Sequence, residues 1–253
     1  MSDNVLIELQ DGILTILFNR PERKNALTPE MFEQICEAME RADEDPDIRV
    51  LVFRGCGGNF TTGNDVSAFP ARPAEGEETL PYRFIKRLVN LTIPVVAGVE
   101  GVAAGIGATM LLQCDSVIMS STARIIMPFL KMAIVPEAGS SLLLPELLGY
   151  TRAADLLLSG DPIDGTTAYE YGIASRLSAP EELEKETLEK ATHFARLPRN
   201  AVRQTRELLK GDTKRIMQRI EEEQTELFRC FASAEHKEAV SAFIEKRPPD
   251  FSK

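Results

Sequence analysis

One carboxylate stands apart from the other acidic residues of the chain. Glu137 follows the apolar stretch 132–136 and precedes a small Ala-Gly-Ser-Ser turn. Upstream lie two glycine-bearing segments, residues 60–65 (FTTGND) and 101–107 (GVAAGIG). A carboxylate can move a proton, and backbone N–H groups exposed at such turns can hold the negative charge that develops on a carbonyl oxygen. These residue types predict proton removal next to a carbonyl, although Glu137 is equally suited to the first turn of a helix, where the dipole favours an acid.

Other chemistries find less support in the residue pattern. A dinucleotide fingerprint would need a third glycine at position 110, which is Met110, and no P-loop or G-x-S-x-G motif is present. His193 and His236 fall in charged, amphipathic segments and are expected at the surface. No spacing of His, Asp, Glu or Cys resembles a metal-ligand set. The expectation is an enzyme without a metal.

Composition narrows the class of protein. The 253 residues carry a net charge of −10, which argues against a general nucleic-acid binder. The four cysteines are scattered without a C-x-x-C pair, the first residues lack a signal-peptide pattern, and no apolar run is long enough to span a bilayer. The last three residues, Phe251-Ser252-Lys253, are not a peroxisomal signal. We therefore expect a cytoplasmic protein with no membrane or nucleic-acid partner.

Strands and helices alternate through the first two-thirds of the sequence. Alternation around Asp11-Gly12 predicts a hairpin, and Thr28-Pro29 predicts a helix start. Further strands are expected at 50–53, 94–99, 116–120 and 124–127, with helices at 80–91 and 105–114. After Glu137 we expect helices at 142–148, 152–158, 165–171, 181–195, 201–209, 214–231 and 235–245. The proline-rich, acidic stretch 69–81 is expected to be a loop, either a solvated insertion or a flap. This order predicts an α/β core over residues 1–195 and a helical region for closure or assembly over 196–253.

Five segments, taken in order, resemble the enoyl-CoA hydratase/isomerase (crotonase) superfamily. They are residues 19–27 (NRPERKNAL), 60–65, 100–115, 162–172 and 242–247. The resemblance implies a crotonase-like spiral of ββα units with a helical C-terminal region, and assembly into homotrimers or dimers of trimers. It also implies an acyl-CoA ligand, with the CoA thioester as the substrate and no separate cofactor.

The resemblance also implies functions for individual residues. The thioester oxygen would be held by the backbone N–H groups of Asn64 and Ile106. The expected contacts with CoA or substrate are Arg23, Lys24, Ala26, Thr62, Asp65, Phe129 and Lys246. Each basic residue is also compatible with a solvated surface charge, and Phe129 with core packing.

The departures from the family pattern indicate the reaction. Hydratases of this superfamily use two glutamates, and the matching positions here are Thr109 and Phe129. Residues 136–141 are instead similar to the peroxisomal-type Δ3,Δ2-enoyl-CoA isomerases, in which a single glutamate at the position of Glu137 is the acid and base. The resemblance therefore implies an enoyl-CoA isomerase. The alternatives are another crotonase-type reaction, such as hydration or dienoyl isomerisation, and a non-catalytic acyl-CoA binding protein.

Overall fold

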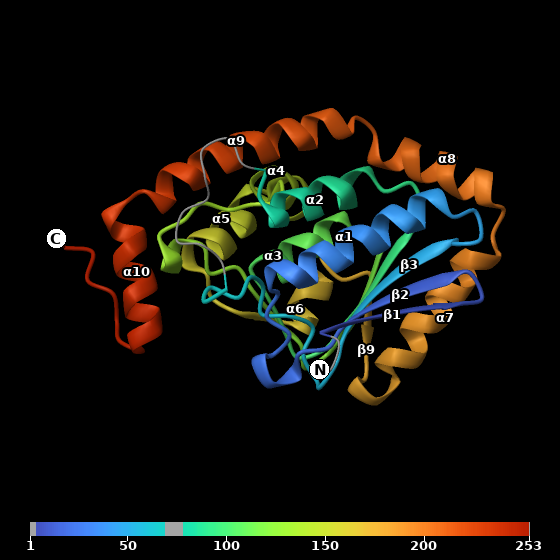
Figure 1. Cartoon of the computed structure of the whole chain (residues 1–253), viewed down its shortest axis with the longest axis horizontal. Helices are drawn as coiled ribbons and strands as arrows, with labels where there is room; N and C mark the ends of the chain where they lie inside the picture. Colours follow the sequence, from blue (N-terminus) through green and yellow to red (C-terminus); the bar gives the residue numbers. More distant parts are fainter. Residues whose placement is uncertain (1–3, 69–77, 253) are drawn as a thin grey trace.

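A six-stranded sheet forms the centre of the protein. The structure is a computed structural model that describes residues 4–68 and 78–252. The strand order is β1-β2-β3-β4-β6-β9 (Figure 1). The strands are β1 (Val5–Gln10), β2 (Ile13–Phe18), β3 (Val50–Gly55), β4 (Val95–Val99), β6 (Ser116–Ser120) and β9 (Arg176–Ser178). β1 pairs antiparallel with β2, and the other neighbours pair parallel.

The predicted hairpin is confirmed. Gln10 pairs with Ile13 across a two-residue turn, with φ of 51° at Asp11 and 78° at Gly12. Two successive positive φ values define the turn whose twist matches that of antiparallel strands. Asp and Gly are suited to this conformation, so the local sequence fixes the register of the first two strands.

The central strands are buried on both faces. Leu51 and Phe53 of β3 belong to the main core, whereas Val50 and Val52 belong to a smaller cluster with Leu183. Helix α7 (Leu183–Arg196) covers that second face, while α1 (Pro29–Glu44) and α2 (Leu80–Asn90) lie on the other (Figure 1). Burial on both faces explains why these strands read as continuous apolar runs rather than as alternating ones.

Helix starts follow the predicted capping chemistry. Thr28 accepts a hydrogen bond from the Met31 N–H at 3.4 Å, and Pro29 is the first residue of α1. Thr79 caps α2 in the same way, so residues 80 and 81 of the expected loop belong to a helix. Residues 69–77, on which the expectation of a loop or flap otherwise rests, lie outside the described residues.

A second, three-stranded sheet makes the fold a spiral. It consists of β5 (Val102–Ala104), β7 (Arg124–Ile126) and β8 (Ile163–Asp164), in that order. The chain places β4 and β6 in the large sheet and the strand that follows each of them, β5 and β7, in the small one. The sequence did not predict β5, β8 or β9, whose two or three residues show little of a period of two, although it did predict the equally short β7.

The expected helix at 105–114 divides into two short elements. Helix α3 (Ile106–Thr109) continues as a 3₁₀ helix, η2 (Met110–Gln113). The remaining helical elements are η3 (Leu130–Met132), α4 (Ser140–Leu148), α5 (Tyr150–Ser159), α6 (Gly165–Glu170), α8 (Arg199–Lys210), α9 (Thr213–Phe231) and α10 (Ala234–Glu245). All seven helices predicted after Glu137 are present, with ends that differ by a few residues.

The C-terminal helices lie along one side of the molecule. Helix α9 crosses α2 and α4, and α10 packs on α9 and η3 at one end (Figure 1). The proposed division at residue 196 coincides with the end of α7 and stays a prediction. Within the described residues, no helix is long and apolar enough to cross a membrane.

Candidate active site

Main-chain pairing brings the two glycine-bearing segments together. The Phe60 N–H donates to the Glu100 carbonyl at 2.7 Å, and the Thr61 N–H donates to the Val102 carbonyl at 3.0 Å. The Ala104 N–H returns a bond of 2.9 Å to the Thr61 carbonyl. Residues 60–65 and 101–107 therefore run side by side, beyond the carboxyl ends of β3 and β4.

Glycines permit a close approach between these segments. A Cβ atom on Gly63 would lie 2.7 Å from the Ala104 carbonyl oxygen and 3.5 Å from the Ile106 nitrogen. A Cβ atom on Gly107 would lie 2.4 Å from Cγ2 of Thr61. Gly63 also has a φ of 84°, which L side chains rarely adopt. Only glycine at position 63 lets the residue after it, Asn64, lie beside the start of α3.

The two predicted oxyanion donors keep their N–H groups unbonded. Asn64 forms a parallel bridge with Leu27, in which the bonds are made by the neighbours Gly63 and Asp65. In a parallel bridge the central residue's own N–H points away from its partner. Ile106 is the first residue of α3 and has no acceptor within the helix. In the part of the chain that the structure describes, neither N–H donates a hydrogen bond, so both are available to an oxygen atom.

Glu137 lies in a tight turn just before α4. Ala138 and Gly139 have φ of 62° and 76°, and the Ser140 N–H donates to the Glu137 carbonyl at 3.0 Å. Nε2 of Gln113, at the end of η2, lies 3.5 Å from the Ala138 carbonyl oxygen. The α3–η2 element thus carries a predicted oxyanion donor at its first residue and contacts the Glu137 turn from its last.

The electrostatic environment of Glu137 favours the protonated acid. Burial raises the pKa of Glu137 to about 7, and the negative charge of Glu223 adds to the rise. An acid in the first turn of a helix would be stabilised in its charged form instead. Because Glu137 precedes α4 and its pKa is raised, the alternative of a simple helix-start acid does not describe it.

The two residues that the sequence analysis matched to the hydratase glutamates, Thr109 and Phe129, lie in the core. Thr109 is fully buried, and its Oγ1 lies 3.3 Å from the Gly105 carbonyl oxygen, as a hydroxyl within a helix commonly does. Phe129 is 3% exposed and belongs to the main core. Of residues 109, 129 and 137, only residue 137 carries a carboxyl group.

Four of the predicted CoA or substrate contacts lie together on the N-terminal signature and the first turn. The Thr62 N–H donates to the Lys24 carbonyl at 3.1 Å, and the Ala26 N–H donates to the Arg23 carbonyl at 3.1 Å. The side chains of Arg23 and Lys24 are exposed. Thr62 is two residues from Asn64, so this group lies near the Asn64 N–H.

Asp65 and Lys246 are placed differently. Asp65 forms an ion pair of 2.6 Å with Arg20. Burial opposes its ionisation, but hydrogen bonds from Ser67 and Arg20 keep the pKa of Asp65 below its usual value. Its charge is therefore already used to hold the turn. Lys246 is the exposed C-cap of α10, a helix that packs on α9 and η3. It therefore does not belong to the group formed by the N-terminal signature and the first turn.

The expectation of two surface histidines is correct for one of them. His193 is exposed on α7. His236 is half-buried, with Nδ1 2.8 Å from the Met132 carbonyl oxygen and its ring 5.1 Å from that of Phe231. The prediction is wrong for His236 because α10 packs against η3, a contact that helical periodicity does not reveal.

The sequence reading also missed Glu223, which lies beside the turn of Glu137. Its side chain is 6% exposed and accepts hydrogen bonds from the Gly139 and Ser141 N–H groups at 2.7 and 2.9 Å. A signal was present, because Glu223 continues the apolar stripe of Ile216 and Ile220 at helical spacing. An acid on such a stripe is predicted to be buried.

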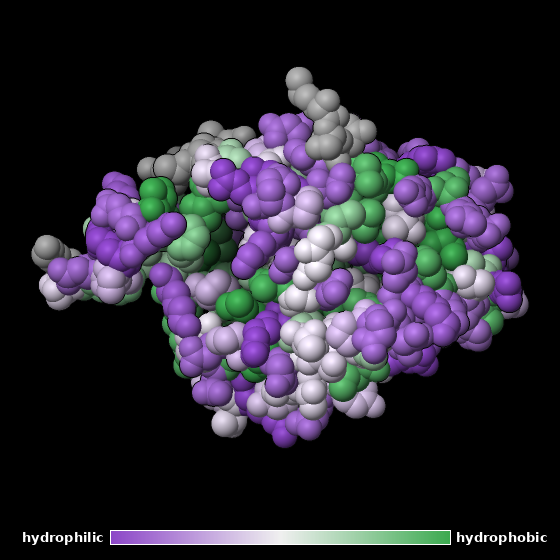
Figure 2. All heavy atoms as spheres, turned by 90° about the horizontal axis from the view of Figure 1, so that it is seen from below, coloured by the Kyte–Doolittle hydropathy of each residue, from purple (hydrophilic) through white to green (hydrophobic). Residues whose placement is uncertain are grey.

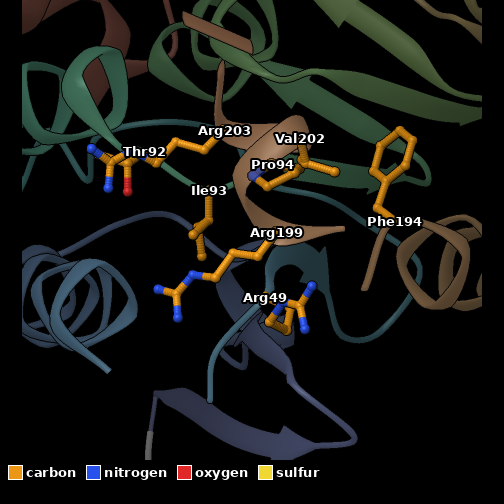
Figure 3. Close-up of a pocket in the computed structure, with 8 residues that line it drawn as sticks. All are labelled: Arg49, Thr92, Ile93, Pro94, Phe194, Arg199, Val202 and Arg203. Atoms are coloured by element: carbon orange, nitrogen blue, oxygen red, sulfur yellow. The ribbon is translucent and has the colours of Figure 1, made fainter. Parts of the chain in front are cut away.

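A separate hollow lies at the other end of the sheet. It is lined by residues that include Arg49, Pro94 and Arg199 (Figure 3). Arg49 and Pro94 directly precede β3 and β4, whereas Asn64 and Ile106 lie beyond the carboxyl ends of these strands. Ligands of parallel α/β sheets bind at the carboxyl ends, so we place the candidate site at the glycine-bearing turns and Glu137. No cluster of metal-binding side chains occurs among the described residues.

This fold and this set of turns have known relatives. The chain belongs to the enoyl-CoA hydratase/isomerase family, whose model matches residues 8–253. It is 32% identical over 260 residues to 1,2-epoxyphenylacetyl-CoA isomerase of Escherichia coli, covering 100% of this chain and 99% of that one. It is 31% identical over 254 residues to enoyl-CoA delta isomerase 2 of Rattus norvegicus, covering 98% of this chain and 65% of that protein.

Solved structures confirm the crotonase-like architecture. The crystal structure of an enoyl-CoA hydratase/isomerase from Pseudoalteromonas atlantica matches with a TM-score of 0.94 and 37% identity, covering 99% of this chain and 100% of that one. The predicted fold class is therefore confirmed, and the protein is placed in an enzyme family that acts on enoyl-CoA substrates.

Proposed function

We propose that this protein is an enoyl-CoA isomerase that moves the double bond of a 3-enoyl-CoA to the conjugated 2-position. The observation that carries the proposal is the single proton-transfer group, Glu137, with its pKa raised to about 7. The resemblance matches Thr109 and Phe129 to the two hydratase glutamates, and neither residue carries a carboxyl group. Activating a water molecule in the hydratase manner needs those two groups, whereas shuttling one proton needs only one.

The proposed reaction begins at C2 of the substrate. The Glu137 carboxylate removes a C2 proton, and the electrons of the C–H bond move toward the thioester oxygen to form a dienolate. The Asn64 and Ile106 N–H groups hold that oxygen as its negative charge grows. Glu137, now protonated, returns the proton to C4, and the electrons come back to form the C2–C3 double bond. The shift is redox-neutral and regenerates Glu137, so it needs no cofactor.

The pKa of Glu137 suits a group that must act as both base and acid. A carboxyl group with its usual pKa is a weak base toward carbon and is almost entirely ionised at neutral pH, although its acid form gives up a proton readily. With a pKa of about 7, Glu137 is divided between its two forms near neutral pH. Glu137 is half-buried rather than fully enclosed, so a substrate can reach its carboxyl group and solvent can exchange with its proton.

The CoA part of the substrate is proposed to lie along the N-terminal signature. Arg23 and Lys24 are exposed cations beside Thr62 and Asn64, so they can meet phosphate groups without disturbing the fold. Phe129 is proposed to contribute to the apolar wall behind the acyl chain, and Lys246 to meet the ligand only through movement or assembly.

A second candidate reaction follows from one relative. The E. coli protein at 32% identity is named for a 1,2-epoxyphenylacetyl-CoA substrate, and the two chains align over nearly their whole lengths. Isomerisation of a ring-bearing CoA thioester would use the same base and the same oxyanion donors. Comparing turnover of a 3-enoyl-CoA with turnover of a ring-bearing CoA thioester decides between the two reactions.

We also propose that the protein assembles as a homotrimer or a dimer of trimers. Large apolar side chains are exposed on the C-terminal helices: Leu208 and Leu209 are more than four-fifths exposed on α8, and Phe243 and Ile244 about two-thirds on α10. Figure 2 shows apolar surface between the projecting end that carries the C-terminus and the body of the protein. Contacts between copies would cover this surface, and sedimentation of the purified protein would test it.

A cytoplasmic location completes the proposal. The four cysteines are unpaired in the structure. Thiols in this state suit a reducing compartment. Fractionation of cells that express the protein would test the location.

Turnover of matched substrates tests the function. With 3-hexenoyl-CoA we expect formation of 2-hexenoyl-CoA, and in deuterated water we expect deuterium at C2 or C4. Water addition to 2-hexenoyl-CoA should be slower than isomerisation of 3-hexenoyl-CoA by a factor on the order of 100. Faster hydration, or turnover only with a ring-bearing thioester, would replace the proposed reaction. Binding of acyl-CoA with no turnover of any of these would indicate the non-catalytic alternative.

A further inference from the structure

A buried carboxylate from a distant helix holds the turn that carries Glu137. Glu223 lies in the second half of α9, and only 6% of its surface is exposed. Oε2 accepts a hydrogen bond of 2.7 Å from the Gly139 N–H, and Oε1 accepts one of 2.9 Å from the Ser141 N–H. These donors are among the first N–H groups of α4, which have no partner within their own helix. Both oxygens of Glu223 are therefore used by the main chain on either side of Ser140.

Apolar contacts seat α9 on the same turn. A Cβ atom on Gly139 would lie 3.3 Å from Cγ2 of Ile216 and 3.5 Å from Cγ1 of Ile220. Ile216, Ile220 and Glu223 follow one another at helical spacing, so one face of α9 presents two apolar side chains and then the carboxylate. The turn 137–141 is thus fixed by α9 in position and in orientation.

We propose that Glu223 is a positioning residue for Glu137, acting through the main chain of Gly139 and Ser141. The inference rests on the proposed function of Glu137 as the acid and base. The turn contains Ala138 at a φ of 62°, a conformation that costs free energy for a residue with a side chain. Two charge-assisted hydrogen bonds, each stronger than a neutral one, hold the turn in this shape.

Glu223 also acts on Glu137 through its charge. After burial, the charge of Glu223 is the second cause that raises the pKa of Glu137. The pKa of Glu223 is itself raised, because the effect of burial outweighs the hydrogen bonds from Ser141 and Gly139 and the charge of Arg219, which lower it. Two N–H donors favour the carboxylate form, and when Glu223 is ionised its negative charge faces the turn from α9. Removing it would make Glu137 a weaker base.

Other charged groups near the turn have partners of their own, although Arg219 also approaches the side chain of Ser141. Arg219 of α9 pairs with Glu222 at 2.9 Å and has a guanidinium nitrogen 3.5 Å from Oγ of Ser141. Lys131 of η3 pairs with Asp161 at 2.9 Å. Glu146 of α4 pairs with Arg215 at 2.6 Å, and His236 of α10 faces the Met132 carbonyl. Among the charged groups, only Glu223 accepts hydrogen bonds from the main chain of the turn in the described residues.

The test compares Glu223→Gln with Glu226→Gln, one turn further along α9, where Glu226 forms an exposed pair with Arg229. The amide of Gln has the same shape, but its single oxygen can accept only one of the two bonds. We expect Glu223→Gln to lower kcat for the 3-enoyl-CoA by about tenfold, with a smaller change in KM. We also expect the acidic limb of kcat/KM to move to lower pH by about half a unit. Glu226→Gln should leave both unchanged.

A second measurement does not depend on the reaction. Infrared difference spectra, assigned to Glu137 by comparison with Glu137→Gln, follow the ionisation of its carboxyl group directly. In Glu223→Gln this ionisation should shift to lower pH. If the shift occurs in a protein that isomerises no 3-enoyl-CoA, the proposed function is wrong and the positioning by Glu223 stands. If isomerase activity is present but neither the pH limb nor the infrared titration moves, Glu223 only stabilises the fold and the inference is overturned.

A conservative variant covers a failure of Glu223→Gln to fold. Glu223→Asp keeps the charge but is shorter by one methylene group, so it cannot reach both N–H groups. We expect about a tenfold loss of kcat with a nearly unchanged acidic limb. Wild-type kcat in Glu223→Asp would contradict the positioning of the turn.

Discussion

The two halves of the candidate site are held in different ways. The oxyanion turns are fixed by main-chain bonds, such as that from the Ala104 N–H to the Thr61 carbonyl, and belong to the sheets. The Glu137 turn lies between elements and depends on side chains, Gln113 from η2 and Glu223 from α9. Backbone pairing tolerates many side chains, provided that glycines stay where the chains approach closely. Side-chain support ties the proton-transfer group to residues far away in the sequence.

The largest effect is expected from removing the proton-transfer group. Glu137→Gln should lower kcat for 3-enoyl-CoA isomerisation by a factor on the order of 10³–10⁴, because neither Thr109 nor Phe129 has a carboxyl group that could replace it. Acyl-CoA binding, measured by calorimetry, should remain, since the oxyanion turns are untouched. Retention of near-normal turnover in a folded variant would separate the reaction from Glu137 altogether.

The next effect concerns the backbone half of the site. Gly63→Ala would place a Cβ atom 2.7 Å from the Ala104 carbonyl oxygen at a φ of 84°. We expect kcat to fall by about 100-fold, as for loss of one oxyanion donor. Gly58→Ala is the matched control, because Gly58 also has a positive φ but nothing lies within 4 Å of its added Cβ. Equal activity in the two variants would show that the close approach of the turns is not needed.

The pH dependence of the reaction tests the electrostatics of the Glu137 turn, the second half of the candidate site. The carboxylate of Glu137 is the proposed base, and burial raises its pKa to about 7. Below that pH, kcat/KM should fall by about tenfold for each unit, because only the ionised fraction can accept the C2 proton. A profile from pH 5 to 9 measures the limb. A limb near pH 4.5 would mean that the carboxyl group is solvated when the enzyme is free.

The smallest effect is on stability. The folded protein holds the proton of Glu137 up to a pH of about 7, whereas the unfolded chain releases it near 4.5. The stabilising contribution of this group is therefore complete below pH 4.5 and is lost as the pH rises to 7. Glu137→Gln does not titrate, so its stability relative to the wild type should improve by at most roughly 3 kcal/mol between pH 4 and 8. Urea unfolding at both pH values gives the difference, and a constant offset would contradict the raised pKa.

Local signals predicted the elements that local chemistry controls. The Asp11-Gly12 turn and the Thr28 cap depend on neighbours within a few residues, and both are confirmed. Strand β5 has three residues, and it exists because its backbone pairs with β7 and bridges to Thr61. No pattern within residues 102–104 indicates such partners. His236 was misplaced for the same reason, because its burial comes from the contact between α10 and η3.

The sequence by itself determined which chemistry is available, since it puts a carboxyl group at residue 137 and none at residues 109 and 129. It also supplied the glycines without which the two turns could not approach each other. Only the tertiary structure decided how acidic Glu137 is and what holds it. A pKa depends on the burial and charges that surround a group, and here α9 brings Glu223 against a turn more than eighty residues earlier in the chain.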